Sequence, residues 1–117
     1  SMYSLTSANR YYLYQGFVRM NLGIDGLFKI IRLEMKDLSP VSGDIFLFFG
    51  KNRQSVKILR WDGDGFLLYY KRLEGGSFEL PTFNPNTGNY EISYQVLSFI
   101  LNGVSLKSVR LRKRFRI

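Results

Sequence analysis

The residues that could do chemistry in this sequence are mainly carboxylates, because the chain contains no histidine and no cysteine. The lack of histidine removes the commonest general base and the commonest metal ligand. The lack of cysteine removes disulfides and thiolate metal sites. Serine and threonine hydroxyls therefore have no histidine partner, and no Gly-x-Ser-x-Gly segment is present. Paired carboxylates holding a divalent metal remain the chemistry to consider.

Two aspartates stand close together in the segment Asp62-Gly63-Asp64-Gly65. This spacing is similar to the start of a calcium-binding loop, but the rest of that pattern is missing. Counting from Asp62, the sixth residue is Leu67 instead of glycine, and the twelfth is Leu73 instead of glutamate. Alternating aspartate and glycine is also what a tight hairpin turn requires. We therefore predict a turn here, and no metal site.

A two-metal nuclease would need these aspartates together with further acids such as Asp25, Glu74 or Glu79. Turn or helix-start positions explain three of these acids without catalysis. Lys51 follows a glycine, but it lacks the upstream glycine and the adjacent Ser or Thr of a phosphate-binding loop. We predict a protein that is not an enzyme and needs no cofactor, and we keep a metal-dependent nuclease as an alternative hypothesis.

The charge of the chain is strongly and unevenly positive, with 17 basic and 9 acidic residues and a net charge of +8. No acid follows Glu91, and the end of the chain is basic. Such an imbalance favours a polyanion partner, which we expect to be DNA, although a charged tail that only aids solubility is the alternative. The basic residues of this tail are Lys107, Arg110, Arg112, Lys113, Arg114 and Arg116.

No apolar run approaches the roughly 20 residues that span a bilayer. The first residues also lack the regions of a signal peptide. The expected location is therefore the cytoplasm, with no membrane partner.

Basic and aromatic residues alternate on two segments that flank the aspartate turn. Strand periodicity places Lys57 and Trp61 on one face and Arg60 on the other. A two-stranded ribbon of this kind could enter the DNA major groove, and its aromatics could stack on unpaired bases. Cross-strand packing is the alternative, favoured for Trp61 and Phe66 and left open for Tyr69 and Tyr70. The candidate DNA-binding residues of this hairpin are Lys57, Arg60, Lys71 and Arg72.

The elements that must position these residues follow from hydrophobic periodicity. Apolar residues at helical spacing predict a helix over 24–35, with Asn21 as N-cap, and a second helix that begins at Ser93. Residues 44–49 are apolar on both faces and predict a central strand. We predict an α+β fold, an antiparallel β-meander of about five strands with two helices packed on it, leaving one face open. The other predicted strands are 10–15, 55–61, 66–74 and the short edge 77–80. Residues 1–105 form the predicted domain, and 106–117 form a basic C-terminal tail or edge strand.

The run from Val56 to Glu74 resembles a signature of the small accessory protein encoded by the second reading frame of IS66-type insertion sequences. The stretch with Met20, Gly23, Asp25, Gly26 and Leu27, and the strand from Ser42 to Gly50, resemble two further motifs of that family. The resemblance extends over roughly residues 11–105. The motif residues of the hairpin are Trp61, Asp62, Gly63, Asp64, Gly65, Phe66, Tyr70, Lys71, Arg72 and Leu73.

This resemblance implies a role in bacterial DNA transposition, beside a separate transposase that carries the catalytic acids and another small partner. We therefore expect a non-catalytic accessory protein that binds DNA through basic residues. The alternative is a protein-interaction module that bridges the transposase and another element-encoded protein. The chain departs from the family motif at Arg19, where relatives have an acid, and at Asn21 and Leu22, where they have basic residues.

Overall fold

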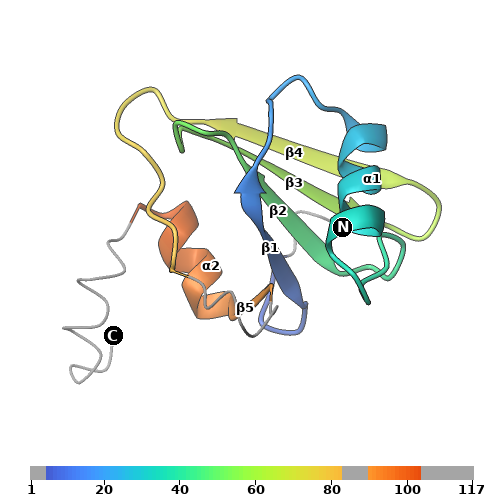
Figure 1. Ribbon diagram of the computed structural model, residues 1–117. Coiled ribbons are helices and arrows are strands. Elements are labelled where there is room, and N and C mark those ends of the chain that lie inside the picture. Colours follow the sequence, from blue (N-terminus) through green and yellow to red (C-terminus); the bar gives the residue numbers. More distant parts are fainter. Residues whose placement is uncertain (1–4, 83–89, 104–117) are drawn as a thin grey trace.

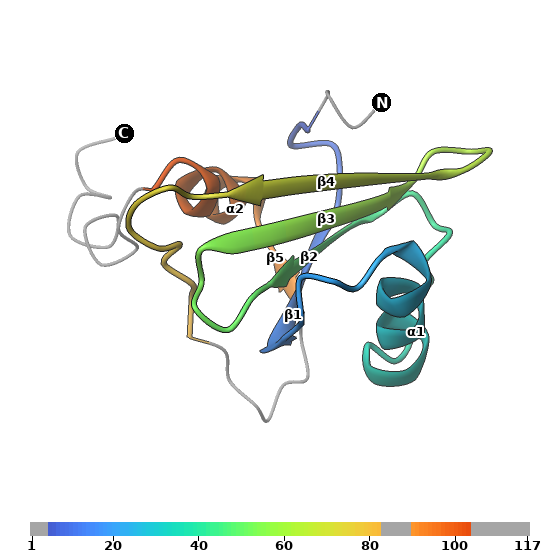
Figure 2. The same ribbon diagram turned by 90° about the horizontal axis from the view of Figure 1, so that it is seen from above.

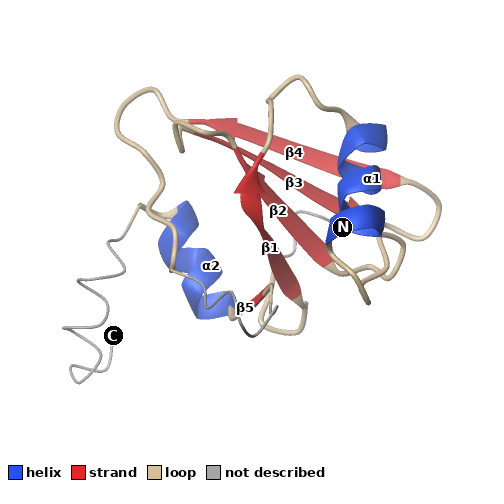
Figure 3. Cartoon of the chain, viewed as in Figure 1, coloured by secondary structure: helices blue, strands red, loops and turns tan. Residues whose placement is uncertain are grey.

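The computed structural model describes residues 5–82 and 90–103, which form one mixed sheet and two helices (Figure 1, Figure 3). The sheet has five strands in the order β4-β3-β2-β1-β5. The predicted α+β class is therefore confirmed. In chain order the elements are β1 (Tyr11–Phe17), α1 (Ile24–Glu34), β2 (Ile45–Phe49), β3 (Ser55–Trp61), β4 (Phe66–Arg72), β5 (Glu91–Ile92) and α2 (Tyr94–Leu101).

β2 is the centre of the sheet, and all of its side chains have 0% exposure. Ile45, Leu47 and Phe49 belong to a core cluster that includes Leu97 and Ile100 of α2. Phe46 and Phe48 belong to a second cluster, which includes Leu27 and Ile31 of α1. Since successive side chains of a strand point to opposite faces, the two helices cover opposite faces of the sheet (Figure 2). We call these the α1 face and the α2 face.

The predicted antiparallel meander is wrong at one pair of strands, because β1 and β2 run parallel, with Leu13 beside Leu47. Parallel neighbours need a crossover, and α1 provides it. The three other strand pairs are antiparallel. The expectation that both helices share one face is also wrong, because β2 is apolar on both faces and each face needs its own cover.

The short edge strand and the N-cap of α1 differ from the prediction for local reasons. Residues 77–80 do not form a strand; Phe78 is buried and its N–H donates to the Arg53 carbonyl at 2.6 Å. The edge beside β1 is instead taken by β5, which is only 2 residues long. α2 was expected to begin at Ser93 and begins at the next residue; Ser93 is its N-cap, and its hydroxyl accepts from the Val96 N–H at 3.1 Å. The N-cap of α1 is Gly23, and not Asn21.

Within residues 5–82 and 90–103, neither helix combines the length and the continuous apolar character that crossing a bilayer requires.

Tyr14 connects the middle of β1, where the register with β2 shifts, to the last turn of α1. Its hydroxyl donates to Oε1 of Glu34 at 2.6 Å. A Cβ on Gly16 would lie 2.8 Å from the end of the Tyr14 ring, so a larger residue there would require the ring to shift. Burial, followed by the hydrogen bond to Glu34, raises the pKa of Tyr14 from 10.0 to about 12.

The free energy of unfolding is expected to fall less at alkaline pH when Tyr14 is replaced with Phe than it does in the wild type. Because the folded-state pKa lies above the unfolded value of 10.0, this group stabilises the fold fully below pH 10 and loses that effect as the pH rises toward 12. Urea denaturation at neutral pH and at about pH 11 measures the difference. An equal loss of unfolding free energy in wild type and Tyr14→Phe would contradict the role given to this hydroxyl.

Candidate nucleic-acid interface

The hairpin β3–β4 forms one edge of the sheet and carries the four basic residues singled out in the sequence. Its register pairs Lys57 with Tyr70 and Ser55 with Arg72 on the α1 face. It pairs Val56 with Lys71 and Ile58 with Tyr69 on the α2 face, to which Arg60 also belongs. The predicted division of faces is confirmed, so Lys57 and Arg72 are separated from Arg60 and Lys71. The tail residues Lys107, Arg110, Arg112, Lys113, Arg114 and Arg116 lie outside the described residues.

The tip of the hairpin is held by aromatic packing. The rings of Trp61 and Phe66 lie edge to face, with centroids 5.0 Å apart, and Phe28 of α1 contacts Phe66 in the same way at 5.9 Å. Cross-strand packing therefore accounts for Trp61 and Phe66. Such pairs contribute about 0.5–1.5 kcal/mol beyond the area they bury. The hairpin is thus anchored on the α1 face, and is not a free ribbon.

The two aspartates of the sequence motif lie in the turn between β3 and β4, as predicted. The N–H of Asp62 donates to the Gly65 carbonyl at 2.8 Å, and Gly63 has φ +83, a conformation that favours glycine. Both Asp62 and Asp64 are exposed. In the described part of the chain, no three Asp, Glu, His or Cys residues gather closely enough to hold a metal ion.

Lys57 connects β3 to the segment that precedes α1. Its Nζ donates to the Leu22 carbonyl at 2.6 Å and lies 5.6 Å from the centroid of the Tyr70 ring. The Leu22 side chain in turn contacts Gly26, where an added Cβ would lie 2.8 Å from a Leu22 methyl carbon. Two motifs that are far apart in the sequence therefore meet at Lys57, which positions both the start of α1 and the Tyr70 ring.

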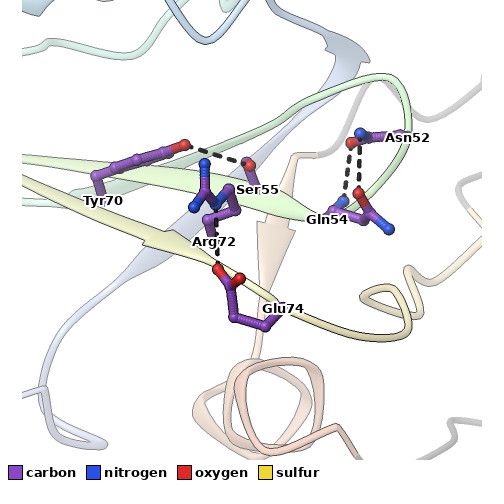
Figure 4. A network of polar contacts seen from close by, with 6 residues as sticks. All are labelled: Asn52, Gln54, Ser55, Tyr70, Arg72 and Glu74. Carbon is purple, nitrogen blue, oxygen red and sulfur yellow. Dashed lines mark hydrogen bonds and ion pairs between the residues drawn. The ribbon is translucent and has the colours of Figure 1, made fainter.

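Ser55, Tyr70 and Arg72 form a polar group on the α1 face of the hairpin (Figure 4). The Ser55 and Tyr70 hydroxyl oxygens are 3.5 Å apart. Arg72 forms an ion pair with Glu74 at 3.3 Å, in which the side chains are 65% and 83% exposed. An exposed pair of this kind contributes about 0–1 kcal/mol, so the Arg72 guanidinium can exchange Glu74 for another anion at little cost.

An open groove of about 560 Å³ lies next to this group. It is formed by the segments that follow β1 and β2, which are held together where the Val18 N–H donates to the Phe49 carbonyl at 2.9 Å. Among the residues that the structure describes, its lining contains two cations and no carboxylate. Carboxyl ends of parallel strands are a common place for ligand sites in sheets with helical crossovers. The groove is lined by Val18, Arg19, Met20, Gly50, Lys51, Asn52 and Ser55.

This groove was not predicted, because an antiparallel meander would not bring the ends of β1 and β2 together. A signal was nevertheless present in the sequence. The motif with Met20 and Gly23 and the motif that ends at Gly50 both lead to the groove, and Met20 and Gly50 line it. Gly23 and Asp25 lie at the start of α1 beside it in the chain.

Comparisons with known proteins agree with these motifs. A family model described as IS66 Orf2 like protein matches residues 9–111. Two proteins of Sinorhizobium fredii are similar to the chain. One, named uncharacterized protein y4hO, is 32% identical over 95 residues, which is 81% of this chain and 80% of the relative. The other, named uncharacterized protein y4jC, is 30% identical over 88 residues, 75% of this chain and 73% of the relative. No solved structure matches the chain.

Replacing Lys57 with Met is expected to lower the free energy of unfolding by about 1–3 kcal/mol, because the Leu22 carbonyl loses a charged donor while the aliphatic stem is kept. Lys71→Met, on the next strand and the opposite face, is the matched control and is expected to change stability by less than about 0.5 kcal/mol. Denaturant titration measures both. Equal effects of the two substitutions would show that the contact with Leu22 does not stabilise the fold.

Proposed function

Because the chain belongs to the family of IS66 Orf2-like proteins, we propose that it serves DNA transposition by binding DNA, without catalysing a step itself. Membership in this family implies an accessory role in an insertion sequence. The finer proposal concerns how that role is carried out, and it rests on the surface of the α1 face.

The observation that carries the proposal is the arrangement of positive charge around the groove. Arg19 and Lys51 line it, and Ser55 joins it to the hairpin, where Lys57 and Arg72 lie on the same face. Basic side chains next to hydroxyl and amide groups suit phosphate oxygens, which accept hydrogen bonds from both. The net charge of +8 adds a long-range attraction to DNA.

Binding of this kind fixes the position of the DNA backbone without reading its sequence. Phosphate contacts release counterions, so the affinity falls steeply as salt is added. The proposed function is therefore to hold DNA for the transposase, with specificity supplied by other components. The basic residues of the C-terminal tail remain predicted DNA contacts, whereas Arg60 and Lys71 lie on the α2 face and are not part of the proposed site.

A second candidate function is the bridging of the transposase and another element-encoded protein. The feature that favours it is exposed aromatic surface on the α2 side of the molecule. Tyr69 is 44% exposed on the α2 face of β4, and Tyr94 of α2 is 40% exposed. Tyrosines are enriched at the centres of protein interfaces. The two functions use different faces and are compatible with each other.

Replacing Arg19 or Lys51 with Glu is expected to weaken binding to DNA, since each cation neutralises a phosphate. The measurement is a fluorescence anisotropy titration with DNA from the ends of the insertion sequence, repeated over a range of salt concentrations. The plot of log affinity against log salt concentration has a negative slope, and this slope should become less steep by about one for each lost contact. Lys71→Glu changes the net charge by the same amount on the opposite face and serves as the matched control.

A wild-type protein that binds no DNA, or that binds with no dependence on salt, would contradict the proposed function. If Lys71→Glu weakened binding as much as Arg19→Glu and Lys51→Glu, the DNA would not be held specifically by the α1 face.

Replacing Arg112, Lys113 and Arg114 together with Glu is expected to lower DNA affinity uniformly across sequences, because phosphate contacts carry no sequence information. The same variant should still be retained by the element's own transposase in a pull-down if bridging depends on the aromatic α2 side. Loss of both activities would argue against two separate surfaces, and unchanged DNA affinity would exclude the tail as a DNA contact.

A further inference from the structure

Tyr69 and Tyr70 are adjacent on β4 and nearly equally exposed, at 44% and 49%, but their surroundings differ. Tyr69 projects to the α2 face, where its neighbour on β3 is the buried aliphatic Ile58. Tyr70 projects to the α1 face, where the Lys57 ammonium and the Ser55 hydroxyl approach its ring and its hydroxyl group. The contacts of Tyr70 with a cation and a hydroxyl group fit the recognition of a nucleotide.

Two neighbouring side chains orient the ring of Tyr70. Lys57 is fixed by the Leu22 carbonyl and lies 5.6 Å from the ring centroid, and the phenol oxygen lies 3.5 Å from the hydroxyl of buried Ser55. The ring is still half exposed, on a strand at the edge of the sheet. A positioned, accessible aromatic ring is what a stacking platform for a base requires.

The groove lies next to the hydroxyl end of the Tyr70 ring. Ser55 contacts the Tyr70 hydroxyl and also lines the groove, so Arg19 and Lys51 are reached from Tyr70 through a single residue. Arg72, directly across from Ser55, adds a third cation on the same side. A base on Tyr70 would therefore have basic groups on the side where the sugar-phosphate backbone continues.

We propose that the α1 face binds single-stranded DNA, with a base stacked on Tyr70 and the adjoining phosphates in the groove formed by Arg19, Lys51, Asn52 and Ser55. This inference rests on the proposed function, and it adds the form of DNA and the residues that select it. Proteins that bind single strands commonly combine aromatic rings with a positively charged groove.

Duplex DNA fits the same surface less well. The faces of its bases are stacked on one another, so Tyr70 would have nothing to stack on without extruding a base. The hairpin is also unsuited to entering the major groove as a ribbon. Its tip carries the exposed carboxylates Asp62 and Asp64, which repel phosphates, and its aromatics Trp61 and Phe66 pack against each other and, through Phe66, against Phe28 of α1.

The test is a fluorescence anisotropy titration of the full chain with labelled oligothymidylate and with a duplex of equal length at the same salt concentration. Wild type is expected to bind the single strand more tightly than the duplex. Tyr70→Leu is expected to lower affinity for the single strand by roughly tenfold or more, as loss of one stacked base does. Tyr69→Leu, with almost the same exposure on the other face, should stay within about twofold of wild type.

Tyr70→Phe keeps the ring and removes only the hydroxyl, so it should retain the preference for single strands and assign the loss in Tyr70→Leu to the missing ring. Duplex binding as tight as single-strand binding, or equal losses in Tyr70→Leu and Tyr69→Leu, would overturn this inference and leave DNA binding intact. No binding of either form would overturn the proposed function as well.

Discussion

The strand Ile45–Phe49 sets the architecture of this protein, because none of its side chains has any exposed surface. Its side chains alternate between two faces, so a single layer of helices could cover only half of them. α1 packs on Phe46 and Phe48, and α2 packs on the cluster with Ile45, Leu47 and Phe49. In the described part of the chain, one helix covers each face of the small sheet, and both faces of β2 are buried in this way.

Covering the α1 face also determines how the candidate site forms. The helix that covers it is inserted between β1 and β2, and this crossover makes the two strands parallel. Parallel strands end on the same side, which brings Arg19 beside Lys51. Lys57 then connects this end of the sheet to the hairpin through the Leu22 carbonyl. The groove, the hairpin and the start of α1 form one surface for this reason.

Much of the fold could be predicted from the sequence, since hydrophobic periodicity reports burial residue by residue. It indicated the position of both helices, the central strand, the hairpin and its division into two faces. Periodicity could not indicate that β1 and β2 run parallel, because side chains alternate with the same period in parallel and in antiparallel strands. β5 was missed since 2 residues carry no periodic pattern. The groove depends on that parallel pairing, so the basic hairpin was predicted as a site and its neighbours Arg19 and Lys51 were not.

Two-dimensional NMR of the labelled full chain, titrated with single-stranded DNA, tests most directly whether the crossover creates the binding surface. The predicted result has two parts: contacts between the backbones of Leu13 and Leu47 that identify parallel strands, and amide shifts concentrated at Arg19, Lys51, Ser55 and Tyr70. Shifts centred instead on Tyr69 and Lys71, or strand contacts that identify antiparallel β1 and β2, would contradict the site proposed on the α1 face.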